Sequence, residues 1–461
     1  MKAQPHNNNN GSLLWRLSKK FDFAADKIIP DPLVFCLILT ILLFVCGILF
    51  TSSSMVDMAR YWYDGIWTQV GFAFQMSFMV VCCAVTARSS QVAHALKKLA
   101  VMVKGPMTAV IFLMAFGYFS SFLNWAFGLI VTPVLAMALS RQVPGLHFPM
   151  LIAAGYSTMV MGQCLSPTGT VYALLASQDH FLFDKIGALP QTVTTYNPAN
   201  VLLWLVLAIG TVVVTLLALP PRASVVEFDD RGAIDPLEGR AEEEEAGART
   251  LSERMNNSRL IMWAVGAAGV FMIAHTIYSN GFFTSLSLNF VIFFFLIANF
   301  FLYSTPAKFI AAYRENLSLA TDIMIQFPFY GGIAGMMAQS GLAVIIIGFF
   351  TSISTAETLP LFSYISSSIL NLFIPSQGGQ WIIQGDIIVE AALQLGADLN
   401  AVINAFVYGD QATNLLQPLY VIPALAVVRM RLKDVWGYMA FLWFIWFIVT
   451  SLGFILIPKL F

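Results

Sequence analysis

The chain has 461 residues, of which 58% are hydrophobic and only 11% are charged, and its formal net charge is −1. This composition excludes an ordinary soluble domain, which needs more charge on its surface, and it provides no basic excess for a nucleic acid. Apolar runs long enough to cross a bilayer recur at 32–50, 201–219, 261–278 and 286–303. We therefore predict an all-α polytopic membrane protein, since a β-barrel would alternate apolar and polar residues in short segments.

Polar segments divide the chain into four parts. Residues 1–30 form a polar N-terminal segment, in which we expect no cleavable signal peptide and which we place in the cytoplasm. Residues 31–219 form a first transmembrane repeat, and residues 258–461 form a second repeat with an extra leading helix. Between them, residues 220–257 contain four consecutive glutamates and predict a solvated cytoplasmic linker.

The two long parts match each other in order. The pentapeptide Ser-Ser-Phe-Leu-Asn at 120–124 returns as Ser-Ser-Ile-Leu-Asn at 367–371, and a polar, glycine-containing break follows each copy. Further along, a break at 166–169 in the first half corresponds to a break at 414–418 in the second half. Interrupted hydrophobic segments at matching places in two halves point to the binding site of a transporter.

The basic residues indicate that the repeats are inverted. The loop at 88–105 carries four basic residues, whereas its counterpart at 341–360 carries none. With the N-terminus inside, every Lys and Arg except Arg60, Lys185 and Lys459 falls on the cytoplasmic side, where such residues are enriched. The counterpart loops would then lie on opposite sides of the membrane.

Two stretches, at about 106–140 and 359–395, are too long for a single span. Each would run to about 50 Å as one helix, against a hydrocarbon core of about 30 Å. We expect each stretch to fold at its middle into a re-entrant hairpin whose tip lines a protein cavity. Two short spanning helices joined at 124–128 are the alternative. The predicted fold is thus two inverted repeats, each with a re-entrant hairpin and a broken transmembrane helix.

In this topology no Lys or Arg lies inside the membrane. An anionic substrate would therefore be held by helix N-termini, backbone N–H groups and amide or hydroxyl side chains, which the four breaks supply. Small polar residues also pack membrane helices together, so the hypothesis depends on the symmetric places of the four clusters. The candidate substrate-binding residues are Asn124, Trp125, Gly128, Ser166, Thr168, Gly169, Asn371, Ser376, Gln377, Gly378, Gly379, Gln380, Asn414 and Gln417.

Acids within the membrane are scarce and therefore informative. Asp410 lies about one helical turn before a break, and with Thr413 it is our candidate for coupling transport to H⁺ or Na⁺. A structural carboxylate that caps a neighbouring helix is the alternative for Asp410. The five cysteines fall in apolar stretches, and we expect no metal site and no other cofactor. The breaks hold mainly amides, hydroxyls and glycines, which argues against a membrane enzyme.

Several segments resemble the bacterial short-chain fatty acid transporter (AtoE) family, from about residue 31 to the C-terminus. The most specific is Pro-Ser-Gln-Gly-Gly-Gln-Trp-Ile-Ile-Gln-Gly at 375–385, although Gln377 stands where the family often has glycine. The break at 166–169 also differs from the glycine-rich version typical of the family. The other supporting segments are 31–35, 124–129, 325–333, 395–399 and 409–418.

This resemblance implies uptake of acetoacetate- or butyrate-like carboxylates across the bacterial inner membrane. The family is grouped with the ion transporter superfamily, which implies an elevator-like motion of a transport domain and a homodimer as the assembly. The expected partners are thus a small carboxylate, membrane lipid and a second copy of the chain. Two alternatives stay open from the residues themselves: a transporter of another small organic anion, such as a dicarboxylate, and a passive anion channel.

Overall fold

The computed structural model describes residues 11–28, 30–178, 180–228 and 250–456, and all regular secondary structure in these ranges is helical. Among the described residues, seven helical stretches are long and apolar enough to cross a membrane. A further pair, Pro306–Gln339 with Leu342–Ser352, bends by 58° at its break and would make an eighth span. The prediction of an all-α, multi-pass protein is therefore confirmed. The acidic run at 242–245 lies outside the described residues.

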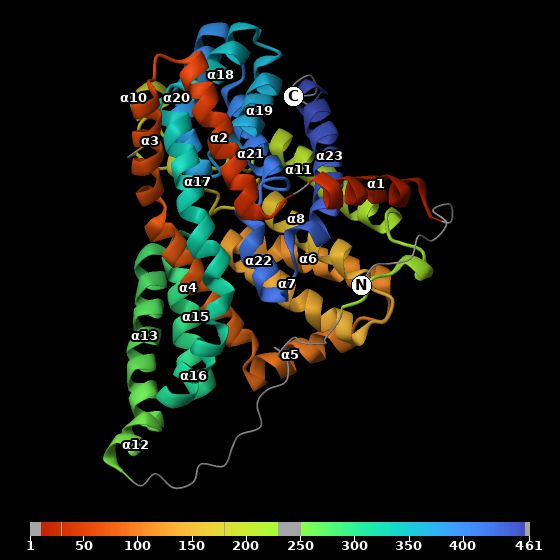
Figure 1. Ribbon diagram of the computed structural model, residues 1–461, viewed down its shortest axis with the longest axis vertical. Coiled ribbons are helices and arrows are strands. Elements are labelled where there is room, and N and C mark those ends of the chain that lie inside the picture. The colour runs from red at the N-terminus through yellow and green to blue at the C-terminus, as the bar shows by residue number, and fades with distance from the viewer. Residues whose placement is uncertain (1–10, 29, 179, 229–249, 457–461) are drawn as a thin grey trace.

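A first group of helices forms the left side of the molecule in Figure 1. Within this first helix group, the last helix packs on the first three. Glycines allow these close crossings, because a Cβ at Gly65 would collide with the backbone oxygen of Gly331. The group comprises α2 (Pro32–Phe50), α3 (Met55–Thr68), α4 (Val70–Ala87), α13 (Arg259–Asn280), α15 (Leu288–Tyr303), α16 (Pro306–Asn316) and α17 (Thr321–Gln339).

A second group contains the segments in which the sequence predicts hairpins and broken helices. This second helix group comprises α6 (Pro106–Leu123), α7 (Trp125–Gln142), α8 (Phe148–Gly162), α9 (Thr170–Leu175), α18 (Leu342–Ser352), α19 (Leu359–Asn371), α20 (Gln377–Leu395), α21 (Leu399–Thr413) and α22 (Val421–Val428). The flanking and connecting helices are α1 (Leu13–Ile28), α5 (Ser90–Val101), α10 (Phe183–Ile186), α11 (Pro198–Leu217), α12 (Leu251–Asn256), α14 (Phe282–Ser285) and α23 (Leu432–Leu456).

Each half of the chain contains two helices joined at a tip, followed by a broken helix. In the first half, α6 and α7 meet at Asn124, whose backbone is extended (φ −162°, ψ 135°), and residues 163–169 separate α8 from α9. In the second half, residues 372–376 join α19 to α20, and residues 414–420 separate α21 from α22. These elements lie where the sequence predicts them. Their re-entrant insertion and the inversion of the two halves stay predictions.

The repeated Ser-Ser pair lies where hairpin and broken helix cross in both halves. A Cβ at Gly162 of α8 would collide with the side chain of Ser121. In the second half, a Cβ at Gly409 of α21 would collide with the backbone oxygen of Tyr364 and lie 2.8 Å from the Cβ of Ser367. Small residues on both faces let membrane helices approach closely. The repetition of the serines is therefore explained by helix packing.

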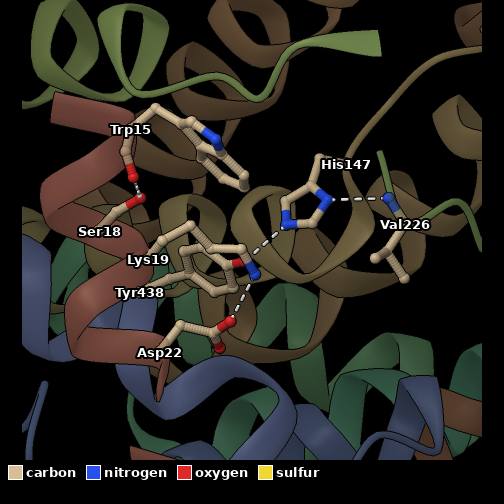
Figure 2. Close-up of polar contacts among 7 residues, drawn as sticks. All are labelled: Trp15, Ser18, Lys19, Asp22, His147, Val226 and Tyr438. Carbon is tan, nitrogen blue, oxygen red and sulfur yellow. Dashed lines mark hydrogen bonds and ion pairs between the residues drawn. The ribbon is translucent and has the colours of Figure 1, made fainter. Parts of the chain in front are cut away.

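The N-terminal helix α1 packs on α23 at the right of the molecule in Figure 1. Figure 2 shows Lys19 paired with Asp22 (Nζ–Oδ2 2.7 Å) and donating to the hydroxyl of Tyr438 at 3.3 Å. This hydroxyl also bonds His147 Nε2 at 2.9 Å, while His147 Nδ1 accepts the N–H of Val226 at 3.0 Å. The cluster thereby ties α1 to α23, to the loop before α8 and to the start of the linker.

His147 is neutral in this cluster. Burial, together with the charge of Lys19, lowers the pKa of His147 from 6.5 to about 3. Since Nδ1 accepts a hydrogen bond, the ring proton resides on Nε2 and is donated to Tyr438. The unfolded chain binds a proton at His147 more readily than the folded chain does. The contribution of neutral His147 to the free energy of unfolding is therefore present above pH 6.5 and is lost as the pH falls toward 3.

Candidate functional site

A cavity of about 600 Å³ lies between the two helix groups. Its volume is within the range of about 300–1,000 Å³ that is typical of small-molecule sites. One wall comes from α17 and from the junction of α3 and α4, through Thr68, Gln69, Phe72, Tyr330, Ala334, Gly335, Ala338 and Gln339. The other wall comes from the second helix group, through Trp125, Met159, Gln163, Thr170, Ile374, Pro375, Ser376, Gln377, Gly378, Gly379, Ile383, Asp410, Gln411, Asn414, Leu419 and Tyr420.

The N-terminus of α20 faces this cavity. The Oγ of Ser376 accepts the N–H of Gly379 at 3.3 Å, whereas the N–H groups of Gln377 and Gly378 have no protein partner in the described part of the chain. Such free N–H groups carry the positive end of the helix dipole, worth about half an elementary charge. A Cβ at Gly378 would meet only the methyl group of Thr170, at 3.2 Å, so this glycine keeps the helix end open to the cavity. This end suits an anion.

Asp410, near the C-terminus of α21, is the acidic residue of the cavity wall. Its Oδ2 accepts hydrogen bonds from Nε2 of Gln411 at 2.9 Å and, more weakly, from Nε2 of Gln377 at 3.4 Å. Its Oδ1 is buried without a hydrogen-bond partner among the described residues. None of the described residues that line the cavity is Lys, Arg or His. Neutral amides therefore surround this carboxyl.

Apolar side chains form the rest of the cavity surface. Trp125, the first residue of α7, packs edge-on against Tyr420, with ring centroids 5.5 Å apart. Phe72, Met159, Ile374, Ile383 and Leu419 add further apolar surface. The cavity thus combines one anion-binding helix end, one acid and an apolar lining, which is the arrangement expected for a small amphiphilic ligand.

The structure brings part of the predicted set to this cavity. Trp125, Ser376, Gln377, Gly378, Gly379, Asp410 and Asn414 line it. The remaining predicted residues are absent from its lining: Asn124, Gly128, Ser166, Thr168, Gly169, Asn371, Gln380, Thr413 and Gln417.

In the first half, these remaining residues hold the tip of the hairpin. Asn124 caps α7, since its Oδ1 accepts the N–H of Ala126 at 2.9 Å, and its Nδ2 donates to the oxygen of Leu286 at 2.6 Å. The hydroxyls of Ser166 and Thr168 donate to the last carbonyls of α6, on Phe122 and Leu123, at 2.8 and 3.2 Å. The polar groups of the first break thus satisfy backbone groups at the helix ends.

In the second half, Asn371 lies at the centre of a buried network behind the cavity wall. Its Nδ2 donates to the oxygen of Asp410 (2.6 Å), to Oγ1 of Thr413 (3.0 Å) and to Oδ1 of Asn414 (2.8 Å). Gln380 donates to Ser367, also behind the wall. Because Asp410 and Asn414 line the cavity, Asn371 positions two cavity residues without lining the cavity itself.

The candidate set omits the entire wall from the first helix group, including Thr68, Gln69 and Gln339. One signal for it was present in the sequence. Residues 55–87 form an apolar stretch of 33 residues, too long for one straight span, and the polar pair Thr68–Gln69 lies near its middle, where α3 ends and α4 begins. Like the two hairpin stretches, residues 55–87 exceed the length of one span, and the polar pair marks the junction of the two helices.

The profile of the short chain fatty acid transporter family matches residues 13–457. The chain belongs to the short-chain fatty acid transporter family. A relative from Escherichia coli (strain K12) is 31% identical over 427 residues, and one from Haemophilus influenzae (strain ATCC 51907 / DSM 11121 / KW20 / Rd) is 31% identical over 433 residues. Each alignment covers 92% of this chain and 96% of the relative. Both relatives carry the provisional name of short-chain fatty acid transporter.

The family assignment supports transport of short-chain fatty acids and a transporter rather than an enzyme. Among solved structures, the Alcanivorax borkumensis YdaH transporter aligns with 94% of this chain and 98% of its own, at 17% identity and a TM-score of 0.42. A likeness at this level carries no information about the site.

Proposed function

We propose that this protein is a secondary active transporter that takes up short-chain monocarboxylates, such as acetoacetate or butyrate, across the bacterial inner membrane. The observation that carries the proposal is the cavity between the two helix groups, which joins an open helix N-terminus to an apolar lining and contains no basic residue among its described lining residues. The family, and the provisional names of both relatives, support the same substrate class.

The substrate carboxylate binds at the N-terminus of α20. The free N–H groups of Gln377 and Gly378 and the hydroxyl of Ser376 lie on that side of the cavity, and Asn414 adds an amide. Preorganised donors and a helix dipole can hold one carboxylate without a buried cation. The short aliphatic tail lies against Trp125 and Tyr420, because apolar contact adds about 0.8 kcal/mol per buried methylene.

The remaining predicted residues support this site rather than contact the substrate. Asn124, Ser166 and Thr168 fix the tip of the first hairpin, and Asn371, Thr413 and Gln380 fix the wall that carries Asp410. Gly128, Gly169 and Gln417 lie in the turns and crossings next to them, where Gln417 accepts the N–H of Leu419 at 2.8 Å. Transport is coupled to H⁺ or Na⁺ through Asp410.

The position of the cavity at the boundary between the two groups supports a transport cycle of alternating access. The first helix group is the scaffold, and the second helix group, which supplies the substrate and coupling residues, moves against it in an elevator-like step. The N-terminus and the linker at 220–257 lie in the cytoplasm, and the apolar outer surface faces lipid. A homodimer, in which the two scaffolds contact each other, is the proposed assembly.

Uptake by purified protein in proteoliposomes tests this function. Butyric acid also crosses lipid unaided, so the signal is the saturable part of labelled butyrate uptake at pH 8, above that of protein-free liposomes. We expect accumulation driven by a pH or Na⁺ gradient, each imposed separately, with butyrate and acetoacetate competing better than succinate. Stronger competition by succinate would indicate a dicarboxylate transporter, and saturable flux without accumulation under any ion gradient would indicate a channel.

A further inference from the structure

Binding of an anionic substrate would bring two negative charges into the cavity. The carboxylate of the ligand and the carboxylate of Asp410 would share one cavity whose described lining includes no Lys, Arg or His. Asp410 is only 1% exposed, so water screens its charge poorly. Two like charges in such a place strongly disfavour each other unless a proton or a cation is bound with the substrate.

The groups that face Asp410 favour a proton over a metal cation. Gln377 from α20 and Gln411 from α21 both direct N–H groups at Oδ2, and a cation at that oxygen would be repelled by these donors. Asn414 of the following break presents its Oδ1 to Asn371. Among the described residues, the thiol of Cys164 and the phenol of Tyr420 interact electrostatically with Asp410, and neither supplies a positive charge.

One oxygen of Asp410 is unpaired among the described residues, although Asp410 lines the cavity. Oδ2 is occupied by the two amides, whereas Oδ1 is buried and has no partner within the described residues. A protonated carboxyl has one O–H donor, and a substrate carboxylate is an acceptor. A carboxyl–carboxylate hydrogen bond with an ionised acceptor is short and strong.

We infer that Asp410 binds a proton together with the substrate and donates the resulting O–H to the substrate carboxylate, so that one proton and one monocarboxylate cross the membrane as an electroneutral pair. This inference rests on the proposed function and specifies its coupling. The proton is taken from the solution on the uptake side, forms an O–H bond at Asp410, and returns to solution in the cytoplasm when the anion leaves. No other bond is made or broken.

The test is butyrate binding to the purified full-length protein between pH 6 and 9, in buffer without Na⁺, by isothermal titration calorimetry. Where free Asp410 is ionised, the butyrate Kd should rise tenfold per pH unit, as required by uptake of one proton per ligand. Calorimetric titrations in two buffers of different ionisation enthalpy should give the number of protons taken up per butyrate bound, which is expected to be one. A wild-type Kd that is independent of pH across this range, or butyrate binding that requires Na⁺, would overturn the inference.

Two variants test whether Asp410 is the residue that binds the proton. Asp410→Asn mimics the protonated side chain, so it should bind butyrate with no dependence on pH, retain counterflow exchange in proteoliposomes and lose accumulation driven by a pH gradient. Asp386→Asn is the matched control, since Asp386 pairs with Lys185 at the surface, at 2.6 Å, and should behave as wild type. If Asp410→Asn keeps the wild-type pH slope, the proton is bound elsewhere and the inference is wrong.

The wild-type measurements keep the inference testable even if Asp410→Asn does not fold. They also separate it from the proposed function. Absence of saturable butyrate binding at every pH and Na⁺ concentration would contradict the proposed function. Saturable binding that is linked to Na⁺ would contradict only the inference of proton coupling.

Discussion

The two hairpins carry the same Ser-Ser-x-Leu-Asn segment, but the structure uses them differently. The tip of the second hairpin supplies Ile374, Pro375, Ser376, Gln377, Gly378 and Gly379 to the cavity, whereas the first hairpin supplies Trp125. The difference begins at the asparagines. Asn124 is itself the turn and caps α7, while Asn371 lies inside the last turn of α19, and a further five residues lead to α20.

This difference shows how a repeated segment can keep its packing role while its chemical role diverges. The serines keep the close crossing with a broken helix in both halves. Only the second tip has the extra residues that turn a helix N-terminus, with two glycines in its first turn, toward the cavity. Substitutions in both hairpins test this difference, and they follow in order of decreasing expected effect.

The largest effect is expected at the second tip, in Gly378→Val. The branched side chain would cover the free N–H groups of α20, and loss of hydrogen bonds to a charged group costs about 1.5–3 kcal/mol. Saturable butyrate uptake at pH 8 should fall by about 100-fold without loss of folding, because a Cβ would contact a single described side chain, the methyl group of Thr170 at 3.2 Å. Gly210→Val in α11 is the control, since nothing lies within 4 Å of its Cβ. Unchanged butyrate affinity in Gly378→Val would remove the second tip from the site.

The next effect is expected in Asn371→Ala. The backbone oxygen of Asp410 and the side chains of Thr413 and Asn414 would lose their shared donor inside the protein. A buried acceptor left unpaired costs about 1–3 kcal/mol, so uptake should fall by about 10- to 100-fold and the melting temperature should drop. Normal uptake with normal stability would show that this network does not position the cavity wall.

Asn124→Ala should have a smaller effect. Loss of an N-cap costs about 1 kcal/mol, which would lower the stability and reduce uptake by several fold, with butyrate Kd little changed. Asn124→Ser keeps a capping oxygen and should restore most of the stability. If Asn124→Ala instead lost much of its butyrate affinity with unchanged stability, the first tip would contact the substrate as the second tip does.

The smallest effects are expected at the repeated serines. The Oγ of Ser367 donates to the oxygen of Phe406 at 2.8 Å, so Ser367→Ala should destabilise the protein by about 1 kcal/mol. The Oγ of Ser121 has no partner in the described chain, so Ser121→Ala should change stability by less than about 0.5 kcal/mol. Thermal unfolding in detergent measures both, and equal losses would show that the two crossings are held in the same way.

Much of the architecture was predictable because it depends on local features of the chain. Length and apolarity predicted the spanning helices, and polar residues with glycine or proline predicted interruptions at 124–128, 166–169, 371–379 and 414–418, close to where the helices end. A stretch longer than the bilayer must bend, and its exposed backbone groups must find partners. The identity of those partners was not predictable in this way. Ser166 and Thr168 satisfy carbonyls of α6, whereas Gln377 and Gly378 face the cavity.

From its residues alone the chain was predictable as an all-helical membrane transporter with polar breaks that contain no basic residue. Which breaks line the cavity became known from the folded molecule, in which Thr68, Gln69 and one face of α17 form the opposite wall. A polar group inside a membrane protein must be hydrogen-bonded, and either a distant segment of the chain or a ligand can be its partner. The choice between them is made by packing between segments that lie far apart in the chain.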